Sequence, residues 1–385
     1  MGKFVKNIIM KNLLIFSITG LLSLTISAQD PVSIYQEGLQ LKQQSKVFEA
    51  SQKFSQALEI KPGYTEALYE LGWCKNDLKD YNGALNALRE VLTSWSTVPK
   101  VSFELAFAFE KSNMVDSAIY YYSNCVSLKP DYSGAYKQLG YIYYTKFDYT
   151  NALDQFAKYE ENNKNDITDY YYWYRKGYAQ NAIKDYSNAK NSLKSSIENK
   201  DDYLHTYLEL GYACSKLNED DEAISYYQKA IDLDPKNHIG YNGIAEIYRD
   251  NKKDPVMAMT WYQKTLAINP NERKANFGMG YCKNSTEKYA EAIPYLKKAI
   301  EMEDGYTAAY IELGYSYYKN GSNAEAINNF DQALKLNPQN ENARYYKCLV
   351  YVSQNDRTNA QKMVDELNTL GSKYGSSLQE RINKM

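Results

Sequence analysis

The amino-acid sequence repeats itself at a fixed interval. The letters ELGY occupy residues 209–212 and again 312–315, a separation of 103 residues, or three steps of 34 plus one. Counted from Gly211 in such steps, units begin at residues 31, 65, 99, 133, 170, 204, 238, 273, 307 and 341. A chain built this way grows by stacking neighbouring units and does not need one large central core. The period therefore constrains the fold more than the length does.

Three positions of the unit keep the same kind of side chain. Position 20 is alanine in every unit, and position 24 is large, as in Phe54, Tyr227 and Phe330. Apolar residues at three- and four-residue spacing on both sides of a polar turn predict two amphipathic helices per unit. Small residues let two helices approach closely, and a large residue fills the space beside that contact. Position 8 is always small: Gly38, Gly72, Ala106, Gly140, Gly177, Gly211, Ala245, Gly280, Gly314 and Cys348.

The register slips twice. Three extra residues fall near 162–169, and one falls within 251–255. We expect a change of superhelical pitch or a modest hinge near 162–170, although a longer loop without a mechanical role would explain the insertion equally well. At the other end, Leu378 and Ile382 lie four apart, which predicts a short capping helix within 372–385.

The pattern resembles the tetratricopeptide repeat, whose signature spacing is W-x2-L-G-x2-Y, then A-x3-F, then P. This resemblance implies an all-α fold, a right-handed superhelical solenoid of about ten helix-turn-helix units over residues 31–371. The unit that begins at residue 307 matches the signature at Tyr310, Leu313, Gly314, Tyr317, Ala326, Phe330 and Pro338.

The resemblance also implies where a partner would bind. In this family the first helices line a concave groove, and positions 2, 5, 9, 12 and 13 face into it. The family often carries asparagine at position 9, whereas seven units here carry an aromatic residue, which puts the family's backbone-clamping mode in doubt. The candidate groove residues at position 9 are Trp73, Phe107, Tyr141, Tyr178, Tyr212, Tyr281 and Tyr315, and those at position 5 include Tyr69, Phe103, Tyr174 and Phe277.

Such an aromatic ladder offers flat and rigid contact area to an extended peptide, a partner helix or stacked sugar rings. Packing against the next helix would account equally well for any single member. The ladder is interrupted in the seventh unit, which carries Asn242, Glu246, Arg249 and Asp250. These residues form either a polar specificity patch or a solvated ion-pair face, and their ordinary helical spacing favours the second.

Composition and motifs exclude several functions. A formal net charge of -2 gives no basic stripe for nucleic acid. The sequence contains no G-x-x-x-x-G-K-[ST], H-E-x-x-H, C-x-x-C or G-x-S-x-G motif. His205 and His238 have no cysteine or histidine close by that would complete a metal site. The register places all five cysteines at inward or semi-buried positions. Cys74, Cys214, Cys282 and Cys348 lie at least two units apart, and Cys125 lies on a second helix while Cys74 lies on a first helix, so we expect buried, unpaired thiols. The sequence predicts a chain that is not an enzyme and uses no cofactor or metal.

Residues 1–28 have the layout of a secretory signal peptide, with a basic start, an apolar run and small residues before Gln29. An uncleaved membrane anchor is the alternative. Nothing after residue 30 is long and apolar enough to cross a membrane. We therefore expect an exported protein that stays in the periplasm or cell envelope, or is secreted.

These observations together predict a non-enzymatic scaffold of the cell envelope that binds a protein partner in the aromatic groove. A glycan- or cell-wall-polymer-binding protein would use the same aromatics. The helical part of a larger enzyme or secretion complex, and a self-associating structural protein, are further alternatives.

Overall fold

The computed structural model describes residues 30–163 and 167–385. This described part of the chain contains 21 α-helices and no strand, which confirms the predicted all-α fold of tandem helix hairpins. The predicted signal peptide, residues 1–28, lies outside the described residues. The chain divides into two compact units, of which the first ends at Ile167 and the second begins at Thr168. This boundary falls in the segment where the sequence carries three inserted residues.

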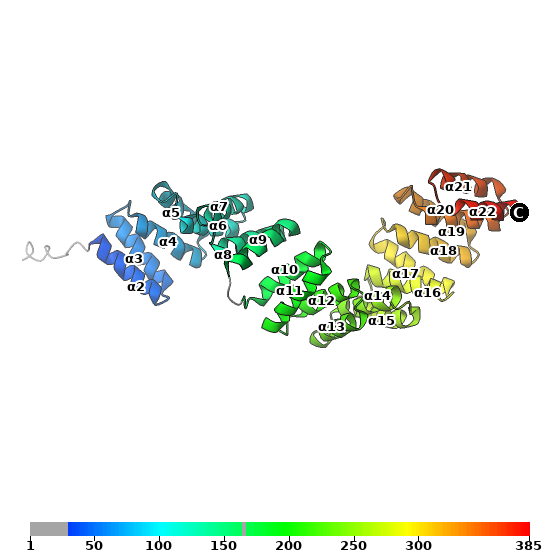
Figure 1. Cartoon of the computed structure of the whole chain (residues 1–385), viewed down its shortest axis with the longest axis horizontal. Coiled ribbons are helices and arrows are strands. Elements are labelled where there is room, and N and C mark those ends of the chain that lie inside the picture. Colours follow the sequence, from blue (N-terminus) through cyan, green and yellow to red (C-terminus); the bar gives the residue numbers. More distant parts are fainter. Residues whose placement is uncertain (1–29, 164–166) are drawn as a thin grey trace, which may run out of the picture. The chain divides into compact units, whose positions relative to one another are not determined.

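Four helix hairpins make up the first unit (Figure 1). The second helix of each hairpin packs on the first helix of the next, and α4 also contacts α6 directly. The helices are α2 (Pro31–Gln43), α3 (Val47–Ile60), α4 (Thr65–Asp77), α5 (Tyr81–Ser94), α6 (Pro99–Lys111), α7 (Val115–Leu128), α8 (Ser133–Thr145) and α9 (Tyr149–Asn162).

Six hairpins and a final helix make up the second unit, and the first helices of successive hairpins contact one another throughout. The final helix buries Leu378 and Ile382 against the last hairpin, at the residues where the sequence predicts a capping helix. The helices are α10 (Tyr170–Ala182), α11 (Tyr186–Asn199), α12 (Leu204–Lys216), α13 (Asp220–Leu233), α14 (His238–Asp250), α15 (Pro255–Ile268), α16 (Arg273–Ser285), α17 (Tyr289–Met302), α18 (Thr307–Lys319), α19 (Asn323–Leu336), α20 (Glu341–Ser353), α21 (Arg357–Thr369) and α22 (Gly375–Asn383).

The core of each hairpin follows the small-against-large rule of the sequence. A Cβ atom added to Gly211 would lie 2.8 Å from the ring of Tyr227, and one added to Gly314 would lie 2.7 Å from the ring of Phe330. Glycine at position 8 therefore makes room for the large residue at position 24. The alanines of position 20 are fully buried: Ala50, Ala84, Ala118, Ala152, Ala189, Ala223, Ala258, Ala292, Ala326 and Ala360.

The extra residue of the second register slip lies in the turn of one hairpin. The turn between α4 and α5 holds three residues, 78–80, and the turn between α14 and α15 holds four, 251–254. Each of these turns contains one residue with left-handed backbone, Lys79 with φ 62° and Lys253 with φ 54°. The extra residue is therefore confined to the turn, and both flanking helices keep their usual lengths of 13 and 14 residues.

The five cysteines are buried and unpaired, as the repeat register predicts. Burial raises the pKa of the Cys74 and Cys282 thiols to about 12. Among the described helices, none has the length and apolarity needed to cross a bilayer.

Candidate binding pockets on the first helices

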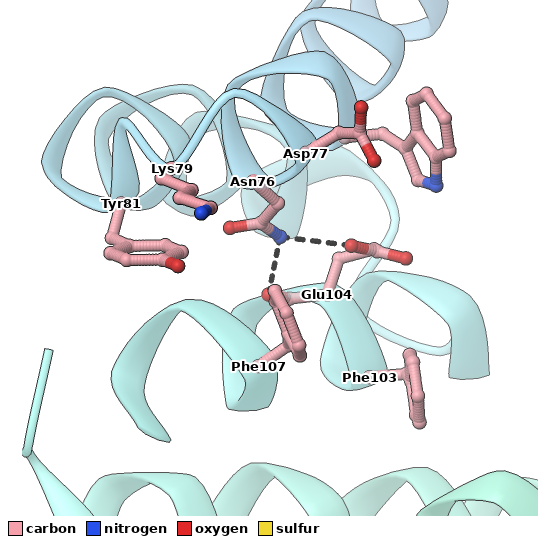
Figure 2. Close-up of a pocket in the computed structure, with 8 residues that line it drawn as sticks. Asn76, Asp77, Lys79, Tyr81, Phe103, Glu104 and Phe107 are labelled. Carbon is pink, nitrogen blue, oxygen red and sulfur yellow. Dashed lines mark hydrogen bonds between the residues drawn. The ribbon is translucent and has the colours of Figure 1, made fainter. Parts of the chain in front are cut away.

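A hydrogen-bonded pair of buried polar side chains joins the first helices of neighbouring hairpins. Asn76 stands near the end of α4, and its Nδ2 donates to the Glu104 carbonyl oxygen at 3.0 Å and to Glu104 Oε2 at 2.8 Å (Figure 2). The asparagine thereby binds the backbone and the side chain of the same glutamate on α6. We call this arrangement an amide–carboxylate pair.

The same pair recurs twice in the second unit. Asn181 Nδ2 on α10 donates to the carbonyl oxygen and to Oε2 of Glu209 on α12, at 3.1 and 2.8 Å. Asn284 Nδ2 on α16 donates in the same way to Glu312 on α18, at 3.0 and 2.9 Å. In each case the partners are 28 residues apart, so that position 12 of one repeat meets position 6 of the next. Glu209 and Glu312 are the glutamates of the two ELGY segments.

The three carboxyl groups lie in an environment that disfavours their charge. Burial raises the pKa of Glu104, Glu209 and Glu312, and the hydrogen bond from the asparagine offsets part of that rise. Each pair thus places a carboxyl group whose ionisation is disfavoured by burial at the contact between two first helices.

An edge-to-face aromatic contact accompanies each amide–carboxylate pair. It joins a tyrosine at the start of a second helix to the position-9 aromatic of the next repeat. The ring centroids are 6.3 Å apart for Tyr81 and Phe107, and 5.9 Å apart for Tyr186 and Tyr212. Tyr289 and Tyr315 repeat the contact at 5.9 Å. Since the polar pair and the aromatic contact recur together, they form one composite feature of the repeat.

In the first unit this feature lines a pocket of ≈ 270 Å³ (Figure 2). Three predicted groove residues lie on its walls: Trp73, Phe103 and Phe107. The amide–carboxylate pair of Asn76 and Glu104 lines it as well.

A larger pocket of ≈ 550 Å³ lies in the second unit, over α10, α12 and α14. Tyr174, Tyr178 and Tyr212, all predicted groove residues, line it together with His205. Polar side chains from three successive repeats also line it, the pair of Asn181 and Glu209 and the further pair of Asn242 and Glu246.

The prediction that Tyr69 faces the groove is wrong. Its side chain is only 7% exposed and belongs to a hydrophobic core cluster. Trp95, which follows α5, packs on it with ring centroids 6.0 Å apart, and Lys100 Nζ lies 4.1 Å from the ring centroid. The residue therefore has too little free surface to contact a partner.

The other predicted residues make aromatic contacts of their own. Tyr141 contacts Phe156 edge to face at 5.8 Å. The ring centroids of Phe277 and Tyr306 are 4.9 Å apart, and those of Tyr315 and Tyr346 are 5.0 Å apart. Tyr281 keeps 40% of its surface exposed. These residues thus combine packing between repeats with partly accessible rings.

The polar residues of the seventh repeat form an ion pair with one solvated partner, since Arg249 binds the exposed Asp250, whereas Asn242 is buried. Asn242 is only 8% exposed and donates to Glu246 Oε1 at 3.1 Å. The Arg249 side chain is 15% exposed, pairs with Asp250 at 2.6 Å and lies within 6.0 Å of the Tyr281 ring centroid. Helical spacing alone could not show that the Arg249 guanidinium lies beside rings of the next first helix.

One group of possible metal ligands occurs among the described residues. Donor atoms of Cys214, Glu219 and Glu222 lie within 4.8 Å of one another. Lys190 Nζ, however, lies 2.6 Å from a carboxylate oxygen of each glutamate. The ammonium group already binds both carboxylates, so this arrangement is a salt bridge between the residues of α11 and those at the start of α13.

The groove residues predicted from the sequence do not include the asparagines and glutamates of the amide–carboxylate pairs. Their signal is an asparagine at position 12 followed 28 residues later by a glutamate, as in Asn181 and Glu209. The 34-residue register does not show this spacing, because the partners occupy different positions of their repeats.

Family models of the tetratricopeptide repeat match residues 66–97, 206–237 and 274–306, and a model described as TPR repeat matches residues 314–355. A TPR repeat-containing protein of Methanocaldococcus jannaschii is 28% identical over 202 residues, which cover 50% of this chain and 35% of that protein. Human tetratricopeptide repeat protein 6 is 26% identical over 144 residues, covering 36% of this chain and 26% of the relative. The chain thus spans about a third or less of these relatives.

Among solved structures, the Cut9–Hcn1 hetero-tetramer of the APC/C contains a chain that is 14% identical to this one. The match covers 92% of this chain and 90% of that chain, with a TM-score of 0.49.

Proposed function

Because this chain is a tetratricopeptide-repeat protein, we propose that it is a non-enzymatic scaffold that binds a segment of a partner protein through the pockets on its first helices. Proteins of this family generally mediate protein–protein interactions and are generally not catalytic. The observation that carries the proposal is the recurrence of one composite, an aromatic wall beside an amide–carboxylate pair, at corresponding repeat positions in two pockets. Aromatic walls supply contact area, and polar groups between them fix the orientation of a bound segment.

Affinity capture tests this proposal. The chain without residues 1–28 would be immobilised and exposed to native extract of the source cells, beside the double variant Tyr178→Ala/Tyr212→Ala. The matched control is Tyr120→Ala, which removes a ring that is 65% exposed on α7 and outside both pockets.

A protein retained by the native chain and by the control, but lost from the double variant, supports the scaffold. Equal capture by all three chains contradicts it. If the retained material survives protease treatment, the aromatic walls bind a glycan or cell-wall polymer, and that alternative replaces the protein partner.

We further propose that the scaffold is exported to the periplasm or cell envelope. The support is the residue pattern of 1–28, a basic start, an apolar run and a small residue at Ala28. N-terminal sequencing of the protein purified from fractionated cells tests this. A chain that begins near Gln29 in the envelope fraction agrees with export, and a chain that keeps Met1 in the cytoplasm contradicts it.

A further inference from the structure

The pocket over α10, α12 and α14 has hydrogen-bond acceptors on its inner wall. It contains the amide–carboxylate pair of Asn181 and Glu209 and, within α14, a second hydrogen-bonded pair of Asn242 and Glu246. In both pairs the asparagine Nδ2 already donates to the carboxylate. The oxygens of these four side chains remain able to accept hydrogen bonds from a ligand.

Two of those oxygens lack any partner. Oδ1 of Asn181 and Oδ1 of Asn242 are buried and make no hydrogen bond, and the residues are only 4% and 8% exposed. Rotating either amide by 180° would bring its oxygen against a carboxylate, so the observed orientation is fixed. A buried acceptor without a donor costs free energy, which a donating ligand recovers.

The pair of Asn284 and Glu312 shows how a neighbouring side chain can satisfy such an oxygen. There, the Ser316 hydroxyl donates to Asn284 Oδ1 at 2.7 Å. The residue at the corresponding position beside Asn181 is Ala213, which has no donor to offer. Asn76 Oδ1, in the smaller pocket of the first unit, is unsatisfied as well. The unsatisfied acceptor thus accompanies the two amide–carboxylate pairs that line pockets and is missing from the pair of Asn284 and Glu312.

Aromatic rings and two lysines also line this pocket. Tyr178, Tyr186 and Tyr212 supply rings, whose faces attract cations. The positively charged residues Lys184 and Lys274 also line the pocket, but both are exposed side chains. Negative charge and acceptors are therefore concentrated deeper than the positive charge.

We propose that this pocket takes an arginine side chain of the partner segment. A guanidinium group is planar, carries five N–H donors and stacks on aromatic rings, which matches two carboxylates, two amide oxygens and a tyrosine wall. The lysines at the rim would face acidic residues that flank this arginine in the partner. The inference rests on the proposed function and adds the chemistry of the bound segment.

The test uses two blocked heptapeptides, glycine and serine throughout except for a central arginine in one and a central citrulline in the other. Citrulline keeps the shape of arginine but has no charge and fewer donors. Ligand-observed NMR of the chain without residues 1–28 would measure saturation transfer and the dissociation constant. We expect the arginine peptide to bind at least about tenfold more tightly than the citrulline peptide, with upfield shifts of its side-chain protons from the tyrosine rings.

The variant Glu209→Gln/Glu246→Gln removes both charges at nearly unchanged shape, and we expect it to lose at least about tenfold of the affinity for the arginine peptide. Glu312→Gln is the matched control, since it neutralises an equally buried pair whose oxygen is already satisfied by Ser316. Thermal unfolding confirms that each variant is folded.

Equal affinity for the two peptides, binding of neither, or an unchanged double variant overturns the inference. If this happens while Tyr178→Ala/Tyr212→Ala still abolishes capture of a protein, the scaffold function stands and only the arginine fails. If capture is also unaffected, both proposals fail.

Discussion

Single side chains decide how the repeats are joined. Ser316 Oγ lies 2.7 Å from Asn284 Oδ1 and 2.9 Å from the Glu312 carbonyl oxygen, so its single proton is shared between these two acceptors. The corresponding residues of the other two pairs are Ala108 and Ala213, and the asparagine oxygens beside them are unsatisfied. The three pairs share one geometry and differ in this one hydroxyl.

We therefore expect Ala213→Ser to stabilise the fold, because its hydroxyl would donate to Asn181 Oδ1 as Ser316 does to Asn284. The free energy of unfolding should rise by about 1 kcal/mol. Denaturant unfolding followed by circular dichroism measures it. The reverse change, Ser316→Ala, should lower the free energy of unfolding by about 1 to 2 kcal/mol, since it leaves a buried acceptor without a donor. A destabilised Ala213→Ser would show that the site has no room for the hydroxyl.

The sequence predicts well those residues whose partners share their hairpin. Gly211 and Tyr227 follow from the register alone, because both lie in one repeat and only their sizes matter. The pair of Asn181 and Glu209 does not follow, because it depends on how the first helix of one repeat is rotated against the next. Tyr69 was predicted at a groove position for the same reason, and Trp95 from the following turn covers it.

At the scale of elements, two helices approach closely where one of them carries a glycine, because glycine has no side chain. A Cβ added to Gly278 on α16 would lie 2.2 Å from Tyr262 Cζ on α15. This glycine occupies position 6, where three other repeats carry the glutamate of an amide–carboxylate pair. The tyrosine ring and the glutamate are thus two alternative ways of filling the same place between hairpins.

Gly278→Ala should consequently push α15 and α16 apart and lower the free energy of unfolding by about 1 to 3 kcal/mol. Gly305→Ala serves as the control, because nothing lies within 4 Å of its added Cβ. Chemical denaturation of both variants compares them directly. Equal stability of the two would mean that the Tyr262 ring moves aside without cost.

At the scale of the whole molecule, the three buried carboxyls link stability to pH. Folding raises the pKa of Glu104, Glu209 and Glu312, so the folded chain binds protons more readily than the unfolded chain. These groups therefore oppose folding at neutral pH, and their cost disappears as pH falls below the glutamate pKa of the unfolded chain.

The triple variant Glu104→Gln/Glu209→Gln/Glu312→Gln should accordingly be more stable than the native chain at pH 7. This advantage should shrink toward zero by about pH 4, where the native carboxyls are protonated. Thermal unfolding of both chains over this pH range measures the difference. A constant gap would show that the three carboxyls do not carry the dependence.

The thiols report on the integrity of the whole array. All five cysteines are buried, and burial raises the pKa of the Cys214 thiol to about 12. We expect a colourimetric thiol reagent to react with none of them in the native chain at pH 8, and with all five after denaturation under non-reducing conditions. Fewer than five reactive thiols in denaturant would reveal a disulfide.

The spacing of the amide–carboxylate pairs also bears on how the chain comes to be folded during synthesis. Each asparagine finds its partner 28 residues further along, Asn76 at Glu104 and Asn181 at Glu209. A chain that emerges from the ribosome N-terminus first can close each pair as soon as the next first helix has emerged. The array can therefore fold hairpin by hairpin while translation continues, without waiting for its C-terminus.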